Sequence, residues 1–273
     1  MGQKSNITTV RSSFKNFNFL NQNSQSFYFI FVFKELVNRL FAIKGVLIAD
    51  SVYNFVNNQL FCVFKAYIRY SKLRFYKKKK YKKQVLTLKN NKGFKKLFGF
   101  ALRILKTNLV VLKFLNLNLL LNKKLLNHIY LKTKYTKKTL FARRYFLFMD
   151  FLGVSALFVQ GFVKTSVFLK ILGEIFRVLP SRRHTFFLKF VKSFLQSIIV
   201  DNIPGQPLNK SKITGVKLTL SGKIQGKSRS STSIILVGSV PIQSIDKNIE
   251  YSRLHVYTVY GSYGMKMWVF KNK

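Results

Sequence analysis

The ionisable residues of this sequence are almost all cations, and the chemistry that they can do is the binding of negative charge. The chain carries 49 Lys and Arg residues but only 7 Asp and Glu residues. The segment between Asp50 and Asp150 contains 25 Lys and Arg residues and no carboxylate. Cations at this density repel one another unless a polyanion neutralises them, so the sequence predicts binding to nucleic acid or to an anionic membrane surface. A charged surface that only faces solvent and binds no polyanion would normally carry basic and acidic residues side by side.

Side chains for catalysis or metal binding are too few and too scattered to predict a site. General acid–base chemistry needs titratable groups brought together. Asp246 and Glu250 are four residues apart, but their flanking sequence is typical of a turn and a strand. Cys62 is the single cysteine, which excludes a disulfide framework and a multi-cysteine metal site. The three histidines have no ligand spacing. We therefore expect no enzymatic activity, no cofactor and no metal.

One stretch, "GKIQGKS" at 222–228, resembles a phosphate-binding loop but does not satisfy its pattern. That loop needs four residues between its glycines, and this sequence has three. It also needs a helix directly afterwards, whereas "SRSSTSIILV" predicts a loop followed by a strand.

The apolar segments are too short or too polar to predict a membrane span, which wants about 20 apolar residues. Residues 16–33 lack charge but contain Asn, Gln and Ser, and the run from Phe151 to Val163 stops at Lys164. The start "MGQKSNITTV" lacks the apolar core of a signal peptide. We expect these segments to be buried in protein, without integral membrane insertion.

The first two thirds of the chain predict an arm, a helix with a hairpin, and a basic insertion. Residues 1–26 are polar and predict an extended N-terminal arm. Apolar spacing predicts a helix over 33–45 that stops at Gly45, then two strands separated by Asn57-Asn58. Residues 72–180 predict a lysine-rich, largely helical insertion, with helical stretches that include Leu97–Leu105 and Leu109–Leu121.

The pattern is sharper after Pro180 and predicts an α+β domain over 181–273. Ser181 is a candidate N-cap, and the residues that follow place apolar side chains on one helical face from Phe187 to Ile199. Beyond it the period changes to two, as in "GVKLTLSG", "SIILVGSV", "RLHVYTVY" and "GMKMWVF". One helix and four strands predict a helix packed on one face of a mainly antiparallel four-stranded sheet.

Four stretches are similar to one known family. They are the start "MGQKSN", "TGVKLTLSGKIQG" at 214–226, "VPIQSIDKNIEYS" at 240–252 and "YGSYGMKMWVFK" at 260–271. In this order they resemble the small-subunit ribosomal protein S three family in its bacterial and organellar form. The last two stretches resemble that family's Val-Pro-Leu segment leading to Asp-Ile-Asp-Tyr, and its closing Tyr-Gly-x-x-Gly-Val-Lys-Val-Trp-Ile-Phe-Lys.

The resemblance implies a structural constituent of the head of the small ribosomal subunit, placed near the site where messenger RNA enters. It implies as partners the small-subunit ribosomal RNA, messenger RNA and neighbouring head proteins of the S ten and S fourteen families. It also implies a KH-type domain before the α+β domain, and residues 27–71 fit a divergent KH-like part. The KH signature is a Gly-x-x-Gly loop. Here that spacing occurs only at Gly261–Gly264, within the α+β domain.

Candidate RNA contacts combine this resemblance with the basic pattern. The resemblance gives Arg182 and Arg183 as messenger contacts, although the family's second basic pair on the same helix is not matched by basic residues. The full set of candidates is Gln3, Lys4, Lys77, Lys78, Lys79, Lys80, Arg182, Arg183, Lys189, Lys192, Lys217, Lys223, Lys227, Arg229 and Lys266.

The wealth of residues with AT-rich codons, including 29 Phe, indicates an organellar gene. We expect a mitochondrially encoded protein of the mitochondrial matrix. Three alternatives stay open from the sequence: a plastid ribosomal protein of the same family, a basic protein of an organellar inner membrane with 145–179 as a tilted hairpin, and a processing factor that visits RNA transiently.

Overall fold

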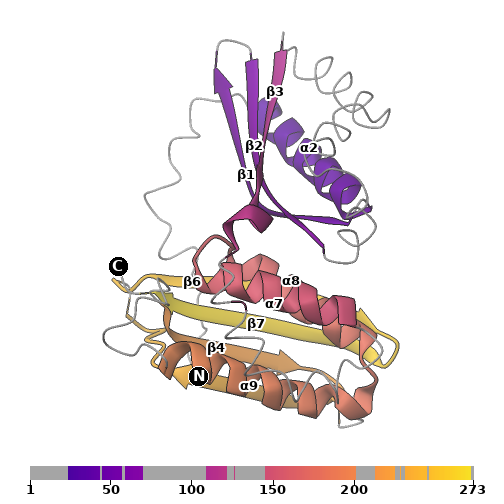
Figure 1. Ribbon diagram of the computed structural model, residues 1–273, viewed down its shortest axis with the longest axis vertical. Coiled ribbons are helices and arrows are strands. Elements are labelled where there is room, and N and C mark those ends of the chain that lie inside the picture. The colour runs from indigo at the N-terminus through magenta and orange to yellow at the C-terminus, as the bar shows by residue number, and fades with distance from the viewer. Residues whose placement is uncertain are drawn as a thin grey trace. The chain divides into compact units, whose positions relative to one another are not determined.

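The described residues form two compact units (Figure 1). Those of the first unit lie between Ser24 and Leu120, and those of the second between Leu121 and Lys271. The computed structural model describes residues 24–43, 45–56, 59–69, 109–121, 126, 145–200, 213–224, 228, 231–244 and 246–271.

The first unit is a helix on a mixed sheet. Its elements are α2 (Ser24–Ile43), β1 (Val46–Val56), β2 (Gln59–Ile68), β3 (Leu109–Asn116) and the 3-10 helix η2 (Leu117–Leu120). The sheet order is β1-β2-β3, with β1 antiparallel and β3 parallel to β2. Phe33 and Phe41 of α2 pack against Tyr53 and Phe64 of the sheet, at ring distances of 6.3 and 6.0 Å. Burial raises the pKa of the Cys62 thiol to about 12, so this cysteine is an inert core residue.

The predicted helix and hairpin of this unit are confirmed, with different bounds for the helix. The strands β1 and β2 pair as predicted, and Gly45, at φ 72°, ends the helix. However, α2 begins at Ser24, nine residues before the predicted start and within the predicted arm. The residues at 27–33 are all apolar, so they show no alternation of polar and apolar positions with a helical period. Periodicity therefore could not detect the first nine residues of the helix.

The prediction of a helix over Leu109–Leu121 is wrong. Residues 109–116 form the strand β3, which pairs in parallel with β2 along its whole length, and only 117–120 are helical. A short apolar run fits a buried strand and a helix equally well, and pairing with β2 decides between them. The side chain of Asn118 completes the pairing, since it accepts from the Ile68 N–H and donates to the Ile68 carbonyl, both at 2.9 Å. The other predicted helical stretch, Leu97–Leu105, lies outside the described residues.

The second unit confirms the α+β prediction (Figure 1). All neighbouring strands of its sheet are antiparallel, in the order β5-β4-β7-β6. Pro180 precedes η3 and Ser181 begins it, so Ser181 is not the N-cap of α9 as the sequence predicted. The elements are α7 (Tyr145–Val159), α8 (Thr165–Val178), the 3-10 helix η3 (Ser181–Arg183), α9 (His184–Val200), β4 (Ile213–Ser221), β5 (Thr232–Gly238), β6 (Ile249–Thr258) and β7 (Gly261–Lys271).

Two helices, where the sequence predicted one, cover one face of the sheet. The period of two places Val216, Leu218, Met265 and Met267 on this face, and all four are buried. α8 packs on β6 and β7, and α9 packs on β4 and β5. The domain boundary at residue 181 stays a prediction; α7 and α8 precede it but belong to the same compact unit as the sheet.

The helices are held together by phenylalanine rings. Phe176 of α8 and Phe187 of α9 meet edge to face with centroids 5.0 Å apart. Phe151 of α7 contacts both Phe168 of α8 and Phe190 of α9, at 6.1 and 5.5 Å. The core position predicted for the segment that begins at Phe151 is therefore confirmed. No helix in the described parts of the chain is long and apolar enough to span a bilayer.

Gly173 lets α8 approach the sheet closely. A Cβ atom at this position would lie 2.7 Å from a methyl group of Val256 and 2.8 Å from one of Leu254, both on β6. Contacts this short are not tolerated, so a larger residue would require these side chains or the helix itself to shift.

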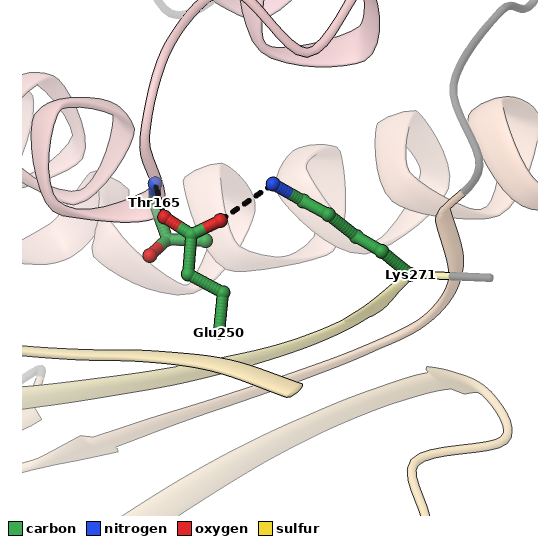
Figure 2. Close-up of polar contacts among 3 residues, drawn as sticks. All are labelled: Thr165, Glu250 and Lys271. Atoms are coloured by element: carbon green, nitrogen blue, oxygen red, sulfur yellow. Dashed lines mark hydrogen bonds and ion pairs between the residues drawn. The ribbon is translucent and has the colours of Figure 1, made fainter. Parts of the chain in front are cut away.

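The first turn of α8 is capped from the sheet rather than from its own sequence. Lys164, at the N-cap position, provides no side-chain cap. Instead the Thr165 N–H donates to Glu250 Oε1 of β6 at 2.8 Å, and Lys271 of β7 donates to Glu250 Oε2 at 2.5 Å (Figure 2). A carboxylate at a helix N-terminus satisfies an orphan donor and meets the positive end of the helix dipole. Glu250 thereby fastens α8 to two strands.

Replacing Glu250 tests this fastening. Glu250→Ala should lower the free energy of unfolding by about 1–3 kcal/mol because it leaves a half-buried ammonium and an N–H unpaired. Glu250→Gln, which keeps an acceptor for Thr165, should cost less. The measurement is urea unfolding of the full-length chain, followed by the fluorescence of Trp268, its single tryptophan. Asp246→Ala, at an exposed carboxylate, is the control. Equal losses for Glu250→Ala and Asp246→Ala would contradict the role.

Candidate nucleic-acid interface

The structure describes seven of the candidate RNA contacts and separates them into two surfaces. Four precede or lie on α9, one follows β4, and two lie on the opposite face of the sheet. The seven are Arg182, Arg183, Lys189, Lys192, Lys217, Lys223 and Lys266. The other candidates lie outside the described residues: Gln3, Lys4, Lys77, Lys78, Lys79, Lys80, Lys227 and Arg229.

Arg182 and Arg183 are exposed on the 3-10 turn that leads directly into α9. Pro180, at φ −65°, sets the direction of the chain, and its carbonyl accepts from the Arg183 N–H at 2.9 Å. The next residue, His184, is fully buried. The turn therefore projects two guanidinium groups from a backbone that is anchored on both sides.

His184 is the anchor behind the arginine pair. Its Nε2 lies 3.0 Å from the carbonyl oxygen of Leu179, and its ring stacks edge to face on Phe176 with centroids 5.3 Å apart. Because a carbonyl can only accept, we assign the proton to Nε2, which leaves Nδ1 as an acceptor facing the Tyr263 hydroxyl at 3.4 Å. Burial lowers the pKa of His184, so the ring is neutral in the folded protein.

Tyr263 joins this anchor to the loop after β4. Its hydroxyl donates its one proton to the Lys223 carbonyl at 3.0 Å, so the approach to the unprotonated His184 Nδ1 at 3.4 Å is a contact and not a second hydrogen bond. The rings of Tyr263 and His184 pack edge to face with centroids 5.6 Å apart. Lys223 itself is exposed. The network thus brings Lys223 to the end of the domain where Arg182 and Arg183 lie, although the sequence separates them by about forty residues. Burial raises the pKa of the Tyr263 phenol, which keeps it a neutral donor.

The outer face of α9 continues the basic surface. Lys189 and Lys192 are exposed, while Phe187, Phe190 and Phe194 on the opposite side of the helix are buried against the core. The chain carries no carboxylate between Glu174 and Asp201, so these cations have no acidic neighbour on their own helix. Together with Arg182, Arg183 and Lys223 they form what we call the α9 surface.

Phe186 also belongs to the α9 surface, although it is not among the contacts predicted from the sequence. It is 62% exposed, on the solvent side of the helix. The predicted binding residues are almost all cations, and the predicted core residues of this helix include its other phenylalanines. The available signal was that Phe186 lies outside the apolar stripe that begins at Phe187.

Lys217 and Lys266 lie on the face of the sheet away from the helices, which we call the open face. The Lys217 ammonium lies 5.5 Å from the centroid of the Trp268 ring, and that ring packs on Tyr251 at 5.2 Å. Ile234 and Leu236 of β5 also point to this face and are 61% and 55% exposed. The sequence correctly assigned Lys266 and Trp268 to the face opposite Met265 and Met267, but it did not separate the two basic surfaces.

The side chains of the α9 surface are suited to binding phosphate. Within the ranges that the structure describes, no three His, Cys, Asp or Glu side chains are grouped so that they could hold a metal ion. What the α9 surface offers is planar guanidinium and flexible ammonium donors, the side chains that contact phosphate oxygens.

Comparisons with known proteins concern the C-terminal part of the chain. A family model described as "Ribosomal protein S3, C-terminal domain" matches residues 196–269. This stretch includes the last five residues of α9 and the four strands of the sheet up to Val269. The chain is 36% identical over 64 residues to the small ribosomal subunit protein uS3 of Trichodesmium erythraeum (strain IMS101). It is 34% identical over 68 residues to the small ribosomal subunit protein uS3c of Thalassiosira pseudonana.

A longer match extends over 98 residues at 30% identity, with the small ribosomal subunit protein uS3c of Gracilaria tenuistipitata var. liui. These three matches cover 23%, 25% and 34% of this chain. They cover 26%, 32% and 45% of the respective relatives, so this chain spans less than half of the length of each.

The buried neutral His184 predicts a loss of stability in acid. An unfolded histidine binds a proton below about pH 6.5, whereas the folded state resists protonation, so stability should be present above that pH and should fall as pH falls below it. One such site contributes a slope of up to about 1.4 kcal/mol per pH unit.

Urea unfolding of the full-length chain between pH 5 and pH 7.5 measures this slope, since each pH gives one free energy of unfolding. His184→Gln should be less stable near neutral pH and should have a shallower slope in acid. The matched control is His255→Gln, at an exposed histidine of β6. A slope that His184→Gln leaves as steep as in the wild type would contradict the assignment.

Proposed function

We propose that this chain is a member of the ribosomal protein S3 family and a structural constituent of the small ribosomal subunit, without enzymatic activity, because the model of that family's C-terminal domain matches residues 196–269. Its proposed role is to bind small-subunit ribosomal RNA. The observation that carries the proposal is the α9 surface, where Arg182, Arg183, Lys189, Lys192 and Lys223 are exposed with no carboxylate on the same helix. Such a surface attracts phosphates, and binding them releases counterions.

The anchored backbone of the α9 surface supports a positioning role rather than loose attraction. His184 donates to the Leu179 carbonyl, Tyr263 donates to the Lys223 carbonyl, and the two rings pack on each other at 5.6 Å, so the arginine turn and the Lys223 loop are held together. A backbone that is held in place before binding loses less conformational entropy when its side chains bind. We propose that Arg182 and Arg183 contact messenger RNA near its point of entrance in the subunit head, as the resemblance to the family implies.

We propose the open face as the contact with neighbouring head proteins, of the S ten and S fourteen families. Exposed Ile234 and Leu236 form an apolar patch on it, and such patches mark interaction sites. Lys217 and Lys266 stay proposed RNA contacts beside this patch.

The first unit is the proposed KH-like part. Its helix and antiparallel hairpin agree with the expectation for residues 27–71, and β3 adds a parallel strand to that hairpin. A parallel strand requires a crossover connection of a dozen residues or more, and residues 69–108 are long enough to provide one. The proposed location is the mitochondrial matrix, on the basis of the Phe-rich, Lys-rich composition, with a plastid ribosome as the alternative.

Sedimentation tests the proposal. Organelles solubilised with detergent in magnesium buffer are run on a sucrose gradient, and mass spectrometry detects the protein. An integral component should sediment with the small subunit through moderate salt. A processing factor should dissociate, and a membrane protein should appear in lipid fractions. Recovery only in free or lipid fractions would overturn the proposal.

A second experiment tests the arginine pair. Full-length protein with both Arg182→Gln and Arg183→Gln should bind a single-stranded RNA oligonucleotide more weakly, and the slope of log affinity against log salt should shrink by about 0.7 for each phosphate that the variant no longer neutralises. Fluorescence anisotropy at several salt concentrations measures the slope. The control, with both Lys164→Gln and Lys170→Gln, removes the same charge from exposed positions at α8. If both double variants reduce the slope equally, the arginine pair has no special role.

A further inference from the structure

Phe186 is an exposed aromatic ring within a cluster of cations. It follows Arg182 and Arg183 by four and three residues and precedes Lys189 by three, the spacings that make neighbours on a helix surface. All four of these side chains are exposed, although η3 and α9 are otherwise anchored to the core. A large ring that is 62% exposed leaves most of its apolar surface in water, which a partner could cover.

The neighbours of Phe186 decide which partner it fits. An apolar ring alone would fit a protein groove, but a protein groove would also have to accommodate Arg182, Arg183 and Lys189 around the ring. Single-stranded RNA satisfies both requirements, because its phosphates pair with the cations and its unstacked bases present flat apolar faces. Duplex RNA satisfies only the first, because its bases are stacked on one another.

We propose that Phe186 is a stacking platform for a base of single-stranded RNA, held between the arginine turn and Lys189. This inference rests on the proposed function of the α9 surface and adds to it that the surface contacts bases as well as phosphates. Stacking on an aromatic ring does not discriminate among bases, so the surface grips any single-stranded sequence. It therefore suits an RNA whose sequence varies.

The position of Phe186 on the helix supports a platform rather than a displaced core residue. The next residue, Phe187, is fully buried and meets Phe176 and Phe151 at ring distances of 5.0 and 6.5 Å. The core of this end of the domain is thus filled without Phe186. His184 anchors the start of the helix through its hydrogen bond to the Leu179 carbonyl. The burial of Phe187 and this anchor together favour the rotation of the helix that presents the Phe186 ring outward.

The test compares two RNA probes of equal length and charge, one with normal bases and one with abasic nucleotides. Phe186→Ala in the full-length chain should lower the affinity for the normal probe by about 5-fold or more, the range found when stacking aromatics are replaced by alanine. Its affinity for the abasic probe and its salt slope should be unchanged, because every cation that pairs with a phosphate is still present. Phe186→Tyr should retain the affinity.

Because so basic a chain can bind RNA at other places, the test also needs a measurement of RNA contact at Phe186 itself. A 4-thiouridine in the normal probe should crosslink to the peptide that contains Phe186, as identified by mass spectrometry, and Phe186→Ala should abolish that crosslink. Phe162→Ala, at another exposed phenylalanine (43%) between α7 and α8, is the matched control and should bind like the wild type. An unchanged urea midpoint for Phe186→Ala shows that it is folded.

The outcomes separate the inference from the proposed function. Suppose that the arginine double variant has a smaller salt slope but Phe186→Ala binds normal RNA as tightly as the wild type. The proposal that Phe186 stacks on a base is then wrong, and the proposal that the α9 surface binds RNA is retained. Equal losses of affinity on normal and abasic probes also overturn the platform. If Phe186→Ala binds RNA normally but fails to join the small subunit, Phe186 contacts a protein instead. If neither variant affects RNA binding, the proposed interface itself is wrong.

Discussion

Coverage of the apolar face of the four-stranded sheet is the constraint on which the rest of this domain depends. The alternation along β4 and β7 places Leu218 and Met267 on one face, and α8 and α9 must cover them to remove them from water. Once the apolar stripe of α9 is committed to the sheet, the other side of the helix faces solvent. The cations and Phe186 are exposed for this reason, so the binding surface is a consequence of how the core is built.

Two polar anchors convert this coverage into a defined geometry. Glu250 holds the first turn of α8 to β6 and β7, and His184 with Tyr263 holds the first residue of α9 to β7 and to the loop after β4. Apolar packing is not directional, so by itself it would tolerate sliding or rotation of a helix. Hydrogen bonds are directional, and buried ones are costly to break. Both anchors lie at helix N-termini, where Glu250 pairs with an otherwise unpartnered backbone donor and His184 pairs with the Leu179 carbonyl.

The two surfaces differ in their apolar side chains rather than in the sign of their charge, since both carry cations. The α9 surface combines its cations with the ring of Phe186, which suits the flexible polyanion proposed as its partner. The open face combines Ile234 and Leu236 with the Trp268–Tyr251 pair beside Lys217 and Lys266, which suits the proposed partner that brings its own apolar surface. The chain has only 7 acidic residues, and Glu250 pairs with Lys271 and the Thr165 N–H.

The sequence by itself determined the class of this domain, the alternation of its four strands and the apolar stripe of α9, and it predicted a polyanionic partner. These follow from local periodicity and composition, which each segment shows by itself.

Only the tertiary structure decided that residues 109–116 are a strand, because their partner β2 is distant along the chain. It also decided that Lys217 and Arg182 lie on different surfaces, that Glu250 caps a helix 85 residues away, and that Phe186 is exposed while Phe187 is buried. Contacts between distant segments leave no local signal in the sequence. They determine which cations of the chain lie together on one surface.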